Sequence, residues 1–178
     1  NKTVRFYHSG ATEDLQTVIS VVMTQTKYSE IALVGFSLGG NLTLKYLGEQ
    51  GEKVHPLIKK AVTFSVPCDL AASVGELAKP ANRIYMKRFL VVLRQKIRAK
   101  MKVMPGQIND DGYEQLKYFR DVDDRYTAPL HGFKNANDYW QKCSCKSFLK
   151  SVAIPALVVN AKDDPFLSPS CYPIEEAN

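Results

Sequence analysis

Blocks of apolar residues separated by polar stretches predict alternating strands and helices along most of the chain. Continuous apolar runs are typical of strands that are buried on both faces of a parallel sheet. The sequence contains three such runs, at residues 31–35, 61–66 and 156–160. Apolar residues at helical spacing predict a helix over 15–22, and a second helix is expected over 38–49 with Leu42 and Tyr46 on its inner face. Residues 3–7 read as a short first strand.

The alternation of strand and helix predicts a mostly parallel central sheet with helices on both faces. One long stretch interrupts this alternation, because residues 70–149 are helical in pattern and the next strand follows only after them. An insertion of this length between two sheet strands predicts a helical cap over the carboxyl edge of the sheet. The chain is therefore divided into core (1–69), cap (70–150) and core again (151–178).

Charge is concentrated in the expected cap. The net charge is +6, and residues 79–102 contain nine Lys or Arg and no Asp or Glu. Apolar residues of this segment are expected on one helical face, with the basic residues mostly away from it: Ile84, Phe89 or Leu90, Leu93, Ile97 and Met101. The favoured interpretation is an ordinary cap helix with solvated charges, and the alternative is peripheral contact with anionic lipid. Binding to nucleic acid is not expected, because no aromatic stacking platform accompanies the charge.

A glycine-rich motif lies at the junction between the buried strand at 31–35 and the following helix: Gly35-Phe36-Ser37-Leu38-Gly39-Gly40. A G-x-S-x-G sequence in this position predicts a nucleophile elbow, in which Gly35 and Gly39 leave room for a strained Ser37. The N–H of Leu38 is then expected to stabilise an oxyanion at the start of the helix. The alternative is a turn that only allows close packing of strand and helix.

A serine nucleophile requires a base, and the base requires an acid to orient it. Asp163 and Asp164 follow the strand at 156–160, and Asp164 is the preferred acid because Pro165 fixes the direction of the chain beyond it. His8, His55 and His131 all precede this loop, whereas the expected order is serine, acid, histidine. The base is therefore expected after Asn178 and the second oxyanion donor before Asn1, so that the chain looks truncated at both ends.

Five segments give the chain a strong resemblance to the YheT or embryogenesis-associated-protein-8 type of α/β-hydrolase. These are residues 7–14, 35–41, 65–70, 123–133 and 161–166, and they occur in the same order as in that family. The resemblance implies an α/β-hydrolase fold and a Ser–Asp–His triad in which Ser37 and Asp164 match the serine and the acid. It further implies a histidine in a Gly-Gly-His motif beyond the acid, and activity on acyl esters or lipids.

The sequence predicts a serine hydrolase that cleaves carboxylic esters through an acyl-enzyme on Ser37. Its alternatives are an acyltransferase with the same triad and a non-catalytic binding protein. No metal or organic cofactor is implied, and the four cysteines favour reduced thiols of an intracellular protein. A cytoplasmic location, or one peripheral to a membrane, is expected. Asp123, Asp124 and Arg125 are expected to form a loop-fixing ion pair, and the 178-residue chain alone is expected to be inactive.

Overall fold

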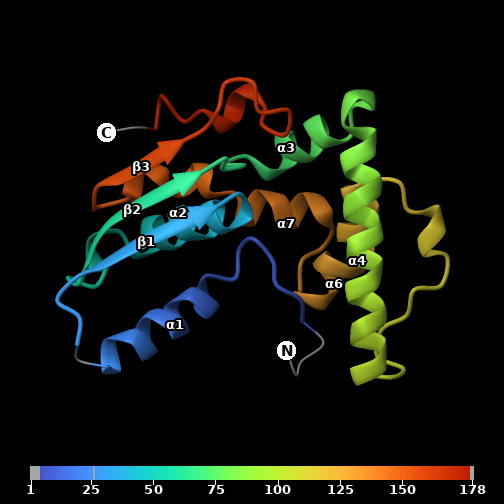
Figure 1. Cartoon of the computed structure of the whole chain (residues 1–178), viewed down its shortest axis with the longest axis horizontal. Helices are drawn as coiled ribbons and strands as arrows, with labels where there is room; N and C mark the ends of the chain where they lie inside the picture. Colours follow the sequence, from blue (N-terminus) through green and yellow to red (C-terminus); the bar gives the residue numbers. More distant parts are fainter. Residues whose placement is uncertain (1–4, 26, 177–178) are drawn as a thin grey trace.

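The computed structural model describes residues 5–25 and 27–176. Its strands are β1 (Ile31–Phe36), β2 (Ile58–Phe64) and β3 (Ala156–Val159). Its α-helices are α1 (Thr12–Thr24), α2 (Leu38–Gln50), α3 (Leu70–Leu77), α4 (Arg83–Val103), α5 (Phe119–Val122), α6 (Ala128–Leu130) and α7 (Ala136–Cys143) (Figure 1). The three predicted internal strands and the two predicted helices before residue 51 are confirmed. Strand β2 begins earlier than expected, because exposed Lys59 and Lys60 conceal its first residues from an apolar pattern.

The three strands form a parallel sheet in the order β1-β2-β3. The register pairs Phe36 of β1 with Phe64 of β2, and Phe64 in turn with Val159 of β3. The carboxyl ends of all three strands therefore lie level at one edge of the sheet. This edge faces the helical region between β2 and β3 (Figure 1). The predicted parallel α/β architecture is confirmed.

The main core lies between the sheet and the helices that precede and follow β1. Ile19 of α1 packs in one cluster with Leu33 of β1 and with Tyr46 and Leu47 of α2. Residues 40–48 of α2 are buried, because the helix packs closely against β1, β2 and residues 145–151. Gly48 allows this contact, since a Cβ atom there would come within 2.2 Å of the carbonyl oxygen of Phe148. Helix α2 is thereby held tightly in place behind the sheet.

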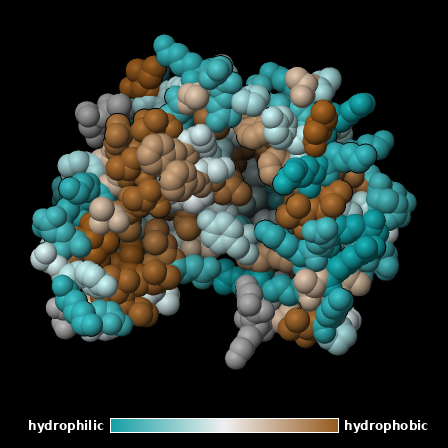
Figure 2. Space-filling model, in the orientation of Figure 1, coloured by the Kyte–Doolittle hydropathy of each residue, from teal (hydrophilic) through white to brown (hydrophobic). Residues whose placement is uncertain are grey.

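The opposite side of the sheet presents apolar side chains to solvent. Val34 and Phe36 of β1 are 60% and 66% exposed, and Leu157 and Val159 of β3 are also exposed. Figure 2 shows these strands as a broad apolar patch on the left of the molecule. The alternation of side chains along a strand explains the contrast, because Leu33 and Gly35 point to the core between these exposed neighbours.

Helix α4 is the long basic helix of the region between β2 and β3. Its inner face packs Ile97 against Ile108, Tyr113 and Tyr126, with Leu90, Leu93 and Met101 beside them. The expectation that Ile84 lies on this inner face is wrong, because Ile84 is 81% exposed. Ile84 and Ile97 are 13 positions apart, which at 3.6 residues per turn separates them by about 140° around the helix. No helix in the described part of the chain is long and apolar enough to cross a bilayer.

The expected first strand is not formed by the residues that the structure describes. Residues 3 and 4 lie outside the described residues, and residues 5–8 are irregular. The backbone N–H of Phe6 donates to Nε2 of His131 at 3.3 Å instead of to a neighbouring strand. The start of the chain is thus attached to the loop after α6, and the strand prediction for residues 5–7 is wrong.

Candidate active site

Ser37 lies in a sharp turn between β1 and α2. Its backbone has φ 51° and ψ −122°, a combination that is costly for any residue with a Cβ atom. The turn is held in place because the Ser37 N–H donates to the carbonyl oxygen of Phe64 at 2.8 Å, and the Ser37 carbonyl accepts from Gly40 and Asn41. The Ser37 residue is exposed. A residue of this backbone conformation, in a turn from a strand into a helix, is the arrangement that a nucleophile elbow requires.

Two glycines make the turn possible, and only one of them, Gly35, was expected. A Cβ atom at Gly35 would lie 2.7 Å from the carbonyl oxygen of Gly39 and from the Cα of Gly40. A Cβ atom at Gly40 would lie 2.7 Å from Cγ2 of Val66. Gly39 has no heavy atom within 4 Å of such a position, so the expectation that Gly39 provides room is wrong. The close contacts are between α2 and the strands, and Gly39 faces away from them.

Leu38 is the first residue of α2. The first N–H groups of an α-helix have no carbonyl partner within the helix, and the helix dipole places positive potential there. The N–H of Leu38 therefore has no carbonyl partner within α2, and it lies directly after Ser37.

Asp164 lies in the loop that follows β3. Its carboxylate accepts a hydrogen bond from the N–H of Phe166 at 3.0 Å, and its carbonyl accepts from Leu167 at 3.2 Å. Asp164 is half-buried, whereas its neighbour Asp163 is exposed. The loop is therefore a structured turn that holds one of the two carboxylates against the protein.

Contacts with the cap hold the Asp164 loop in place. The rings of Tyr85 and Phe89 on α4 meet the ring of Phe166 edge to face, at centroid distances of 5.0 and 6.2 Å. Asn82 is buried and donates one hydrogen bond to the carbonyl of Pro165 and another to that of Glu76. Sequence reasoning missed Asn82 and its role, because nothing in an isolated Asn before a basic helix indicates a partner 83 positions away.

Ser37 and the Asp164 loop share the carboxyl edge of the sheet, with the end of β2 between them. The N–H of Ser65 donates to the carbonyl of Val159, just as that of Ser37 donates to Phe64. Asn160, which follows β3, links three segments at this edge. Its side chain accepts from the N–H of Val66 after β2 at 2.8 Å and donates to the carbonyl of Cys171 at 2.9 Å. Neighbouring strands are about 4.8 Å apart, which separates the ends of β1 and β3 by about 10 Å.

A family model described as serine aminopeptidase, S33 (Hydrolase_4) matches residues 8–171. The chain belongs to this α/β-hydrolase family.

Three curated relatives align with nearly the whole of this chain. YheT of Escherichia coli (strain K12) is 33% identical over 179 residues, which cover 99% of this chain and 52% of YheT. Phospholipase ABHD3 of Homo sapiens is 35% identical over 98% of the chain and 42% of its own length. Monoacylglycerol lipase ABHD2 of Homo sapiens is 25% identical over 97% of the chain and 43% of its own length. The chain spans about half the length of the curated relatives it matches.

Within the described residues, the hydrogen bonds and ring contacts of the three histidines involve neither Ser37 nor Asp164. His55 is exposed before β2. His8 is buried against His131, with ring centroids 4.3 Å apart. Burial, and secondarily the neighbouring His131 and Arg5, lowers the pKa of His8 to about 4. Within the described residues, the hydrogen bonds of His8 and His131 go to Arg5, Phe6, Gly10 and Cys143.

The family motif around residue 123 has a structural role in the cap. Asp123 is buried and accepts a hydrogen bond from the indole N–H of Trp140 at 2.8 Å, and burial raises the pKa of its carboxyl group. Asp124 accepts from the N–H of Ala136 at the start of α7. Arg125 donates to Asn109 instead of to either aspartate. The expected ion pair is wrong, because both carboxylates are used by α7.

Asn41, which belongs to the motif at residues 35–41, joins the core to the cap. Its fully buried side chain donates to the carbonyls of Ser9 and Cys143 and accepts from the N–H of Cys145. The segment at 8–10, helix α2 and the end of α7 are thereby linked through one amide. Sequence reasoning included Asn41 in a motif without seeing this function.

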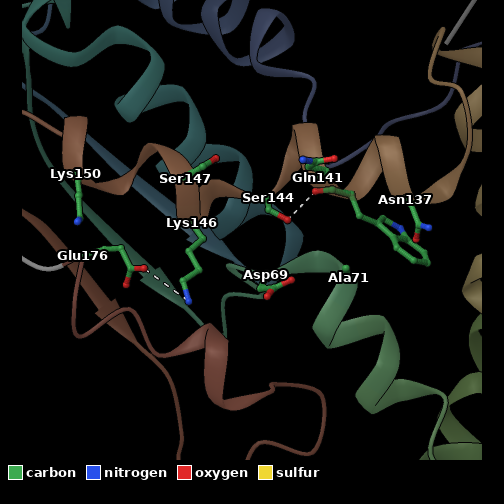
Figure 3. A pocket seen from close by; sticks show the side chains of 10 residues that line it. Asp69, Ala71, Asn137, Gln141, Ser144, Lys146, Ser147, Lys150 and Glu176 are labelled. Carbon is green, nitrogen blue, oxygen red and sulfur yellow. Dashed lines mark hydrogen bonds and ion pairs between the residues drawn. The ribbon is translucent and has the colours of Figure 1, made fainter.

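A surface cavity of about 580 Å³ lies elsewhere, between α3, α7 and residues 144–150 (Figure 3). Three of its charged groups already have partners, because Lys146 pairs with Glu176 at 3.7 Å and Asp69 accepts hydrogen bonds from Ala72 and Ser170. Neither Ser37 nor Asp164 lines it. Within residues 5–25 and 27–176, no group of three or more His, Cys, Asp or Glu is placed to hold a metal ion.

Proposed function

We propose that this protein hydrolyses carboxylic esters of lipid-like acyl groups, with Ser37 as nucleophile. The observation that carries the proposal is the strained, exposed Ser37 at the N-terminus of α2, on the same sheet edge as the Asp164 loop. The names of two relatives, a phospholipase and a monoacylglycerol lipase, support an ester of a fatty acid as the substrate class.

The reaction proceeds through an acyl-enzyme. The Ser37 hydroxyl attacks the ester carbonyl while a base takes its proton, and the N–H of Leu38 stabilises the oxyanion that forms. Collapse of the tetrahedral intermediate expels the alcohol, which receives the proton from the base. Water then attacks the acyl-serine with the help of the same base, and the fatty acid is released with Ser37 regenerated.

Asp164 orients the base, which we assign to a histidine that follows Asn178 in the protein. An imidazole with a hydrogen bond at each nitrogen spans roughly 8 Å, which suits two groups at the ends of strands β1 and β3. His8 and His131 are unsuitable, because they are engaged with each other and with the N-terminal segment. It follows that residues 1–178 alone do not turn over substrate.

Labelling with a fluorophosphonate probe tests the nucleophile. The protein at its natural full length is expected to react, and Ser37→Ala is expected to abolish the label. Ser147→Ala is the matched control, because Ser147 is an exposed serine that lines the cavity of Figure 3. Label that survives Ser37→Ala and disappears with Ser147→Ala would move the nucleophile to that cavity. A folded protein without any label would favour a non-catalytic binding protein.

Substrate assays then separate the ester hydrolase from its rivals. Monoacylglycerol, a phospholipid and an aminoacyl anilide are offered to the same preparation, and release of fatty acid from an ester is expected. Cleavage of the anilide alone would indicate a peptidase. Transfer of the acyl group to an added alcohol, with little free fatty acid, would indicate an acyltransferase that uses the same serine.

A further inference from the structure

The outer face of α4 carries apolar side chains that the fold leaves in contact with water. Ile84 and Val103 are 81% and 66% exposed, and Val91 is 51% exposed. These three residues, with Val92, lie on the side of α4 away from Ile97 and the packed face. Helix α4 therefore has two apolar faces, of which only the inner one is covered by the described residues.

Basic side chains flank this outer apolar face. Among the described residues, no acidic partner is recorded for four cations of the helix beside this face: Lys87, Arg88, Lys96 and Lys102. The other basic residues near the middle of α4 differ, because Arg94 and Arg98 pair with Asp110. The cations beside the outer apolar face thus keep their charge without an acidic partner among the described residues, whereas Asp110 neutralises Arg94 and Arg98.

We propose that the outer face of α4 binds the surface of an anionic lipid bilayer. Apolar side chains between lysines and arginines on one helical face match the boundary between headgroups and acyl chains, where the apolar groups enter and the cations remain among the phosphates. Charge complementarity distinguishes this partner from a protein core, which would bury the unpaired cations at a cost. Nucleic acid would use the cations and leave the apolar residues in water.

The placement of α4 gives this contact a consequence for the site. In Figure 2 the apolar residues of the right-hand side appear as small patches among hydrophilic ones, where Figure 1 draws α4, and a hollow separates them from the sheet. The flank of α4 that carries Tyr85 and Phe89 contacts Phe166 in the Asp164 loop. A bilayer on the outer face would therefore lie about one helix diameter, roughly 10 Å, from the acid loop. This consequence rests on the proposed function, whereas the binding itself does not.

Co-flotation of the 178-residue chain with vesicles tests the binding. Vesicles of phosphatidylcholine alone are compared with vesicles in which about a third of the lipid is phosphatidylserine, at low and at high salt. Binding is expected on the anionic vesicles and is expected to weaken with salt. Equal binding to both kinds of vesicle would overturn the proposal and would point to the apolar patch over the sheet.

Three matched variants locate the contact. Replacement of Lys87, Arg88, Lys96 and Lys102 by Gln is expected to weaken binding by more than about a hundredfold, since each cation contributes about a factor of five. Ile84→Ser with Val91→Ser is expected to weaken it by about tenfold or more. The control replaces four exposed lysines outside α4 by Gln, which removes the same charge and is expected to change binding little: Lys53, Lys117, Lys134 and Lys162.

Two results would overturn the proposal. If the control weakens binding as much as the α4 variant does, net charge alone explains the attraction. If the chain binds a DNA duplex more tightly than anionic vesicles and only the lysine variant abolishes it, the partner is a nucleic acid. Circular dichroism of each variant verifies the fold, and all substituted side chains are exposed. Fluorophosphonate labelling of Ser37 is measured separately on the protein at its natural full length, so that absence of vesicle binding by the unsubstituted protein, with labelling intact, contradicts the lipid surface and not the nucleophile.

Discussion

The side chain of Asn82 donates a hydrogen bond of 2.8 Å to the carbonyl oxygen of Pro165, the residue directly after Asp164. A second bond from the same amide goes to Glu76 at the end of α3. One buried side chain thus connects the start of the cap helix α4 with the loop that holds the candidate acid. The acid loop takes its position from the cap as much as from strand β3.

Asn82→Ala is expected to lower the free energy of unfolding by about 1–3 kcal/mol, because two carbonyls lose their donor. It is also expected to slow the fluorophosphonate reaction of Ser37 through a shifted acid loop. Urea unfolding and labelling rates measure the two effects. Gln107→Ala is the control at an exposed side-chain amide and is expected to stay within about 0.5 kcal/mol. Equal losses in both variants would contradict a specific role of Asn82.

The glycines of the elbow allow a paired test. Gly35→Ala is expected to destabilise the protein by about 3 kcal/mol or more, because the new Cβ would collide with the backbone of Gly39 and Gly40. Gly39→Ala has open space and is expected to leave stability unchanged or to raise it by up to about 1 kcal/mol through helix propensity. Thermal unfolding of the two variants decides the matter. A larger loss for Gly39→Ala would contradict the packing described for this turn.

Among the described residues, Ser37 and Ser65 are the two that have a positive φ without being glycine, and φ of Ser65 is 50°. Ser65 lies beside Ser37 at the end of the neighbouring strand. Ser65→Gly is expected to raise the free energy of unfolding by up to about 1 kcal/mol, because relief of backbone strain exceeds the added freedom of the unfolded chain. Ser20→Gly within α1 is the control and is expected to lower it by roughly 0.5 kcal/mol. Losses of the same size in both variants, seen by urea unfolding, would show that Ser65 is not strained.

Acid is expected to weaken the attachment of the N-terminal segment to the cap. The folded protein keeps His8 neutral, because burial, His131 and Arg5 lower its pKa to about 4. The pKa of His131 is lowered as well, mainly by burial. Since the unfolded chain binds these protons near pH 6.5, stability is expected to fall as the pH drops from about 6.5 to about 4.

Urea unfolding at pH 7 and pH 5 measures this loss. Around His8 the charged or titratable groups are Arg5, Glu13, Lys45, His131, Tyr139 and Cys143. His8→Asn keeps an acceptor near the N–H of Gly10 and is expected to reduce the difference between the two pH values. His55→Asn, at an exposed position, serves as the composition-matched control. An unchanged pH dependence in His8→Asn would assign the acid sensitivity to other groups.

Much of the fold followed from local sequence. Continuous apolar runs identified β1, β2 and β3, because such runs are typical of strands in a parallel sheet. One face of β1 and β3 is nevertheless exposed in the described residues, at Val34, Phe36, Leu157 and Val159. The G-x-S-x-G sequence between β1 and α2 located the turn at Ser37 before any coordinates, because only small neighbours permit its backbone. Asp164 was chosen for its position after β3, which the structure shows as a structured half-buried turn. Its catalytic role stays a prediction.

Sequence alone determined the three internal strands, the two helices before residue 51 and the position of the candidate nucleophile, because periodicity and turn chemistry are local properties. Tertiary structure decided which face of α4 is covered, that Gly40 and not Gly39 provides the close contact, and that His131 binds the N-terminal segment. It also brought the side chain of Asn82 into hydrogen-bond contact with the Asp164 loop, and it paired both aspartates of the 123–125 motif with N–H donors of α7. These relationships join residues far apart in the chain, and their partners are fixed only when the sheet and the cap pack together.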